Sequence, residues 1–81
     1  MTQHEKILLY LVEHPSTGIT IRDGFRLGIN WPHKRIRELE EMGVQIKRID
    51  DENDGTRFRR YVLANKEKAE ELIESYERKR A

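Results

Sequence analysis

The stretch ITIRDGFRLGINWPHKRIRELEEMG, residues 19–43, decides the fold of this chain. Its second half predicts a helix that begins at Pro32, because a proline disfavours helical geometry in the residue before it and suits the first helical turn. Asn30 or Trp31 then occupies the N-cap position. Gly43 is placed to end the helix, since it can adopt the left-handed conformation that common C-caps need.

The predicted helix has two different faces. Its apolar residues recur every three or four positions and mark a buried face; they are Pro32, Ile36, Leu39 and Met42. The opposite side carries Asn30, Lys34, Arg37 and Glu41. A shorter helix precedes it, opened by a capping box from Thr20 to Asp23. Two helices joined this tightly, with the second one's outer face basic, predict a helix-turn-helix.

The shorter helix should end near Gly28. We expect Phe25, together with Leu27 or Ile29, to anchor it in the core. Gly24 costs up to about 1 kcal/mol relative to alanine inside a helix. Its presence therefore indicates close approach of the neighbouring helix.

Regular patterns flank this stretch on both sides. Thr2 and Glu5 predict a capping box for a first helix, whose inward residues are Ile7, Leu8, Leu11 and Val12. Residues 19–21 are β-prone and could pair with a later hairpin. That hairpin is predicted for residues 44–49 and 56–63, joined by a protruding polar loop that contains the turn signal Asp54-Gly55.

The faces of the hairpin are only partly determined by the sequence. Alternation predicts that Val44 and Ile46 point inward while Gln45 and Lys47 point outward. On the return strand the sequence does not decide which face packs on the core. One face carries Tyr61 and Leu63, and the other carries Phe58, Arg60 and Val62.

A last helix should follow Asn65, which is placed as its N-cap. Its narrow apolar stripe consists of Ala69, Leu72, Ile73 and Tyr76. Leu72, Ile73 and Tyr76 either fold back on the first helix or form a dimer contact with the same helix of another subunit. We therefore divide the chain into a domain over residues 1–64 and an amphipathic helix over residues 65–81, whose charged end we expect to fray.

The composition excludes several classes of function. The chain has 81 residues and no cysteine, so one small core must suffice without disulfides or thiolate metal sites. His4, His14 and His33 lack metal-ligand spacing. With no glycine-rich phosphate loop and no nucleophile beside a base, we expect neither an enzyme nor a cofactor. The longest apolar run is too short to span a bilayer, so we expect a cytoplasmic protein without membrane contact.

The net charge of +1 conceals a segregated distribution. One basic group, Lys34, Arg35 and Arg37, lies on the predicted second helix of the helix-turn-helix. A second, Lys47, Arg48, Arg57, Arg59 and Arg60, flanks the acidic residues Asp50, Asp51, Glu52 and Asp54. Clustered cations on two elements that the fold presents together favour nucleic-acid binding.

The order of elements resembles that of small winged helix-turn-helix proteins of phages and prokaryotic regulators. The segments TQHEKILLYLVEH, RDGFRLGIN, HKRIRELEEMGVQI and RRYVLA carry the resemblance. It implies an α+β fold, with a three-helix core, a β-hairpin wing over residues 44–63 and an added C-terminal helix. In that family the third helix, here residues 32–42, enters the DNA major groove and the wing touches the backbone or minor groove.

The resemblance also implies which residues contact DNA. On the groove side it places Asn30, Trp31, His33, Lys34 and Arg37; on the wing it places Lys47, Arg48, Arg57 and Arg59. Glu38 and Glu41 should also lie on the outer face and repel phosphate, so we expect only the first two turns to enter the groove. Trp31 either stacks on a sugar or base or packs over Arg35. His33 either donates to a phosphate or is a partly exposed structural histidine.

Together these observations predict sequence-specific binding of double-stranded DNA, with transcriptional regulation in a prokaryotic or phage-infected cell as the role. No small-molecule effector is evident, and a homodimer is one of two open arrangements. Two alternatives stay open as well. One is a protein–protein interaction module in a larger assembly, and the other is an accessory factor in DNA replication or recombination.

Overall fold

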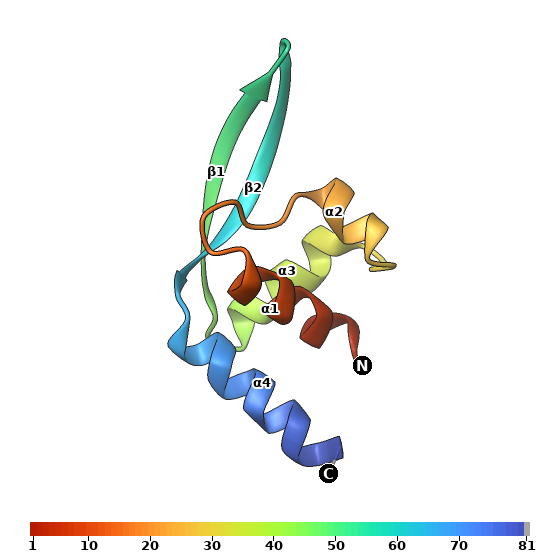
Figure 1. The fold of residues 1–81 in the computed structure, drawn as a ribbon, viewed down its shortest axis with the longest axis vertical. Coiled ribbons are helices and arrows are strands. Elements are labelled where there is room, and N and C mark those ends of the chain that lie inside the picture. Colours follow the sequence, from red (N-terminus) through yellow and green to blue (C-terminus); the bar gives the residue numbers. More distant parts are fainter. Residues whose placement is uncertain (81) are drawn as a thin grey trace.

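Four helices and one antiparallel hairpin make up residues 1–80, which the computed structural model describes, and give the chain an α+β fold (Figure 1). In chain order the elements are α1 (Gln3–Glu13), α2 (Ile21–Arg26), α3 (Pro32–Glu41), β1 (Gln45–Asn53), β2 (Thr56–Asn65) and α4 (Glu67–Arg80). The hairpin projects well beyond the helices, and α4 lies beside α1 at the opposite end of the molecule. None of the helices in this range is long and apolar enough to cross a membrane.

Side-chain caps set the starts of three helices. Thr20 and Asp23 form the predicted capping box on α2, with bonds of 3.0 and 3.1 Å. Asn65 Oδ1 accepts the Glu67 amide at 2.8 Å and so caps the first turn of α4, although the helix begins one residue later than predicted and Lys66 occupies the N-cap position. Thr2 Oγ1 accepts the Glu5 amide at 3.1 Å, but the capping box predicted there is only half formed. The carboxylate of Glu5 instead lies buried against α4.

The core forms where α1, α3 and β2 meet. Its fully buried side chains include Ile7, Leu8, Leu11, Ile19, Ile29, Ile36 and Leu39. Gly24 meets Pro32 closely, because a Cβ built on Gly24 would lie 2.7 Å from the ring of Pro32, and this confirms the predicted helix contact. The prediction that Phe25 and Met42 are buried is wrong, because Phe25 is 63% exposed and Met42 is 40% exposed. Ile29 rather than Phe25 anchors the short helix.

The hairpin is longer than predicted. Residues 50–53, which were expected to form a loop, continue β1 and pair with β2 through to Asn53 and Thr56. The turn consists of Asp54 and Gly55 alone, with φ of 50° and 78°, which is the geometry that a two-residue hairpin turn requires. Asp50 and Asp51 are accommodated in the strand because each pairs with an arginine of β2: Asp50 with the directly opposite Arg59, and Asp51 with the diagonal Arg60.

The base of the hairpin is covered on both sides. Ile19 pairs with Tyr61 through two backbone bonds of 2.8 Å, as predicted for the short β segment. Tyr61 and Val62 are both buried although they belong to opposite faces. Gly18 explains this, because it lies directly against Tyr61 and Val62 with φ of +65° and leaves no room for a side chain.

Helix α4 folds back on the chain's own core. Ala69 is buried, and Leu72, Ile73 and Tyr76 are partly buried against the core cluster. The charged end does not fray as expected. Instead the helix continues to Arg80, whose guanidinium pairs with the buried carboxylate of Glu5 on α1.

Candidate nucleic-acid interface

The first turn of α3 is held in an unusual conformation. Trp31 is the N-cap residue, with φ of 53° and ψ of 64°, and its side chain provides no capping bond. Left-handed geometry is costly for a bulky residue. The indole is 68% exposed and meets His33 edge to face, with ring centroids 6.3 Å apart. The predicted packing over Arg35 is therefore wrong.

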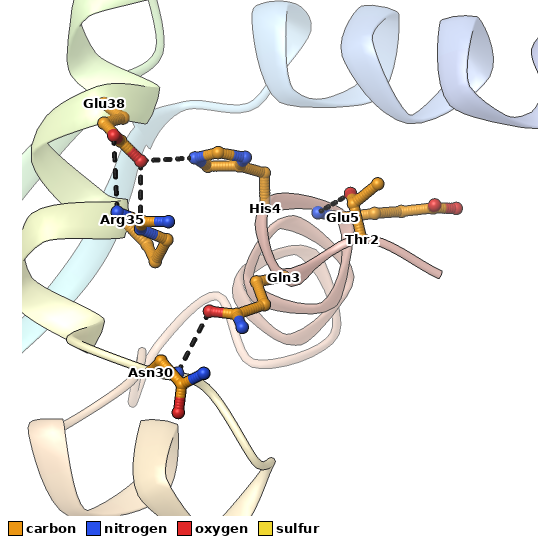
Figure 2. Close-up of polar contacts among 7 residues, drawn as sticks. All are labelled: Thr2, Gln3, His4, Glu5, Asn30, Arg35 and Glu38. Atoms are coloured by element: carbon orange, nitrogen blue, oxygen red, sulfur yellow. Dashed lines mark hydrogen bonds and ion pairs between the residues drawn. The ribbon is translucent and has the colours of Figure 1, made fainter.

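The chain segment entering α3 is fixed by α1. The backbone amide of Asn30 donates to Oε1 of Gln3 at 3.0 Å (Figure 2). Because this bond uses the main chain, the side-chain amide of Asn30 keeps its donor and acceptor for a ligand. Asn30, Trp31 and His33 are all exposed at this end of the helix.

The outer face of α3 presents two cations to solvent. Lys34 and Arg37 are exposed, and neither makes an ion pair with any residue from 1 to 80. They lie opposite the buried stripe of Pro32, Ile36 and Leu39. Their charge is therefore available to an anionic partner.

Glu38 does not lie on this outer face, so that prediction is wrong. Its Oε1 is 2.8 Å from Nε2 of His4 on α1 (Figure 2). Arg35 Nε is 2.9 Å from the same oxygen but off the line of a hydrogen bond, whereas Arg35 Nη2 donates to Oε2 at 3.4 Å. The hydrogen bond with His4, and then the charge of Arg35, lower the pKa of Glu38. Glu41 is the carboxylate that stays exposed on this helix face.

Two of the four predicted wing cations are already compensated. Arg48 donates to both oxygens of Glu40 on α3, at 3.0 and 2.6 Å, and this bond lowers the pKa of Glu40. Arg59 Nε donates to Asp50 at 2.9 Å, which raises the pKa of Arg59. Arg57 and Lys47 make no ion pair within the described residues.

The register separates these four residues by face. Arg48, Arg57 and Arg59 share one face of the hairpin, whereas Lys47 lies on the other. Because Arg48 reaches Glu40, the first face adjoins α3. Arg37 precedes Glu40 by three residues on α3, and its charge also contributes to lowering the pKa of Glu40.

Two further cations lie on α2 and were missed by the sequence analysis. Arg22 and Arg26 are exposed, with the exposed Phe25 between them, and no carboxylate of residues 1–80 pairs with either. Their spacing of four residues places them on one helix face, which was a usable signal. The expectation of a buried Phe25 obscured it.

Comparison with known proteins adds no relative. No family model, curated protein or solved structure matches this chain.

Proposed function

We propose that this chain is a winged-helix protein that binds double-stranded DNA in a sequence-specific way, with α3 in the major groove and the hairpin as wing. The observation that carries the proposal is the pair Lys34 and Arg37 on the outer face of α3. Most cations of the hairpin and of α4 face a carboxylate, but these two project from α3, where Glu38 is turned toward His4 of α1 and Glu40 is bonded to Arg48.

The roles of the side chains follow from their chemistry. Arg37 or Lys34 can donate to O6 and N7 of guanine, and Asn30 can pair with adenine, each good bidentate contact discriminating by about 1 to 3 kcal/mol. Lys47 and Arg57 supply phosphate contacts from the wing, which add affinity without reading sequence. Arg48 acts chiefly within the protein, because its pair with Glu40 fixes the hairpin relative to α3.

A titration with duplex DNA at several salt concentrations tests the proposal. Lys47 and Arg57, the two cations assigned to phosphates, predict that log K falls against log salt with a slope of about −1.8 or steeper, at roughly 0.9 per neutralised phosphate. Lys34→Ala and Arg37→Ala should weaken binding and relax specificity. Arg78→Ala, on the exposed side of α4, is the matched control and should leave both unchanged. Absence of salt-sensitive binding by the wild type would falsify the proposal.

Selection of bound sequences from a random duplex pool addresses the regulatory role. A transcriptional regulator should enrich a defined motif, and a symmetric dimer should enrich two half-sites about one helical turn apart. Leu72, Ile73 and Tyr76 contact the chain's own core, so we expect a single half-site and a monomeric mass across a concentration range. Enrichment of bent or branched DNA without a motif would instead favour a replication or recombination accessory role.

A protein-interaction module is the second candidate. The observation in its favour is that two large aromatic side chains, Phe25 and Trp31, are exposed close to the α2–α3 turn. It predicts a stoichiometric partner that is retained after nuclease treatment and lost in Phe25→Ser or Trp31→Ser. Retention of that partner by both variants would count against it.

A further inference from the structure

A groove runs between the start of α2 and the outer edge of β2. It encloses about 670 Å³ and is lined at one end by Thr20 and Arg22, and along the hairpin by Thr56, Arg57 and Arg59. The groove thus brings together side chains that lie some 35 residues apart in sequence. Of the DNA contacts proposed above, that of Arg57 alone lies in this groove, and none involves Arg22.

Cations outnumber acids along its walls. Arg22 and Arg57 have no carboxylate within 4 Å among residues 1–80, and Asp54, at the tip of the hairpin, is the acid that lines the groove. A second hollow of about 740 Å³ on the hairpin has the opposite balance. There Asp50, Asp51 and Glu52 line the space with Arg57 and Arg59.

The backbone of β2 adds donors to the same groove. Tyr61 directs its N–H and C=O away from β1 toward Ile19. Hydrogen bonding alternates along an antiparallel strand, and the pairing of β1 with β2 is regular from Ile46 to Asn53. The amides of Arg59 and Arg57 therefore point to the same outer edge, beyond the point where the chain turns from Ile19 into α2.

Two kinds of ligand could use this edge. An incoming β-strand would pair with the exposed amides, but its backbone carries no charge to neutralise Arg22 and Arg57. A phosphodiester backbone accepts hydrogen bonds from main-chain amides and neutralises guanidinium groups at the same time. The combination of both donor types in one groove favours the phosphodiester.

We propose that this groove binds the phosphodiester backbone of one DNA strand, between Arg22 of α2 and Arg57 of the hairpin. The inference rests on the proposed DNA binding and adds a second point of attachment, on the side of the hairpin that faces α2. Arg22 and Arg57 position the duplex and are indifferent to its sequence.

The test compares Arg22→Ala, Arg57→Ala and the double variant with Arg78→Ala. Arg78 is an exposed arginine on α4 and does not line the groove, so it is the matched control. Arg22→Ala and Arg57→Ala should each lower affinity about fivefold at low salt, equally for all sequences, and reduce the salt slope by about 1. Arg78→Ala should change affinity by less than about twofold. All three substituted arginines are solvent-exposed, and urea unfolding verifies that the variants fold.

DNA carrying one neutral methylphosphonate at each position in turn sharpens the test. One position should weaken the wild type, and the same position should have no further effect on Arg22→Ala, because the lost contact is shared. Unchanged affinity and slope in Arg22→Ala, while Lys34→Ala weakens binding, would overturn the groove and leave the proposed function intact. Absence of salt-sensitive binding by the wild type would remove the proposed function itself. Self-association without DNA that persists in Arg57→Ala and is lost in Arg57→Pro, which removes the outward amide donor, would show that the edge takes a β-strand instead.

Discussion

Trp31 has two unfavourable features, a strained backbone and an exposed indole, that the fold does not require. A bulky residue at φ of 53° is strained by about 1 to 2 kcal/mol, and its indole is left mostly in water. The turn into α3 is fixed by other contacts, namely Pro32 against Gly24 and the Asn30 amide on Gln3. Strain retained beside a candidate ligand surface is typical of functional positions.

Trp31→Ala and Trp31→Gly separate the strain from the function. Both remove the indole, so both should weaken DNA binding equally, by about fivefold if one base is stacked. Glycine tolerates left-handed geometry and alanine does not, so Trp31→Gly should be about 1 kcal/mol more stable to urea than Trp31→Ala. The single tryptophan also reports directly, since stacking on DNA should quench the wild-type fluorescence.

Equal stability of the two variants would contradict the left-handed conformation of Trp31. Wild-type affinity in both, with unquenched fluorescence, would exclude the indole from the interface. A structural role alone predicts the stability difference without any change in binding.

Local signals at single residues were predictable from the sequence, and burial was less so. The caps at Thr20 and Asn65 depend on neighbours within three residues. Gly24 indicated a contact between helices, because glycine destabilises a helix and its presence there suggested close packing. The predictions that Phe25 is buried and that Glu38 lies on the outer face were wrong, because the surroundings of both side chains come from distant parts of the chain. Ile29 fills the place expected for Phe25, and His4, on another helix, draws Glu38 away from the outer face.

At the scale of elements, the hairpin shows why its length could not be read from composition. Aspartate is unfavourable in strands, so Asp50 and Asp51 predicted a loop. In the structure Asp50 lies directly across the ladder from Arg59, which donates to it at 2.9 Å, whereas Asp51 lies across from Phe58 and accepts from the diagonal Arg60 at 3.2 Å. Opposite charges on adjacent strands stabilise the pairing. Which arginine faces which aspartate can be predicted only once the register of the two strands is known.

The ion pair between Asp50 and Arg59 predicts that the acidic residues of the hairpin reduce its affinity for DNA. Asp50 competes with phosphate for Arg59, so Asp50→Asn should raise DNA affinity about two- to fivefold at low salt, less at high salt. Glu74→Gln on α4 removes the same charge far from the hairpin and is the matched control. An equal gain in both variants, measured by fluorescence anisotropy, would show an effect of net charge alone.

Helix α4 depends on a contact between the two ends of the chain. Glu5 is 1% exposed, and its ion pair is made by Arg80 in the last turn of α4. Arg80→Ala leaves a carboxylate buried without its cation, which should lower the free energy of unfolding by about 1 to 3 kcal/mol. Lys79→Ala, on an exposed neighbour, should stay within about 0.5 kcal/mol. Urea titration measures both, and an Arg80→Ala variant as stable as the wild type would contradict the contact.

At the scale of the whole molecule, one hydrogen bond and one ion pair connect α3, the element that we propose to read DNA, to its surroundings. His4 and Glu38 join α1 to α3, and Arg48 and Glu40 join α3 to the hairpin. The sequence predicted the helix and hairpin themselves, because their periodicity and turn residues are local. It could not predict which cations would be compensated, nor that Arg22 and Arg57 would share one groove, because both depend on how the elements are arranged.

These pairs predict how stability depends on pH. The pKa of Glu38 is lowered by its bond with His4, that of Glu40 by Arg48, and that of Asp51 by the amide of Glu52 and by Arg60. A carboxyl whose pKa is lower in the folded than in the unfolded chain stabilises the fold above the unfolded value, here 4.5 for glutamate and 3.8 for aspartate. That contribution is lost as pH falls through the folded pKa. The free energy of unfolding should therefore decrease from about pH 5 to pH 3.

Glu40→Gln tests which group is responsible. At pH 7 the variant lacks the charged bond to Arg48 and should be less stable than the wild type. As pH falls through its lowered pKa, Glu40 of the wild type becomes protonated and resembles glutamine, so the two urea curves should converge toward low pH. A constant difference at all pH values would mean that Glu40 stabilises the hairpin through packing and not through its charge, and the hairpin would then be held to α3 without the ion pair.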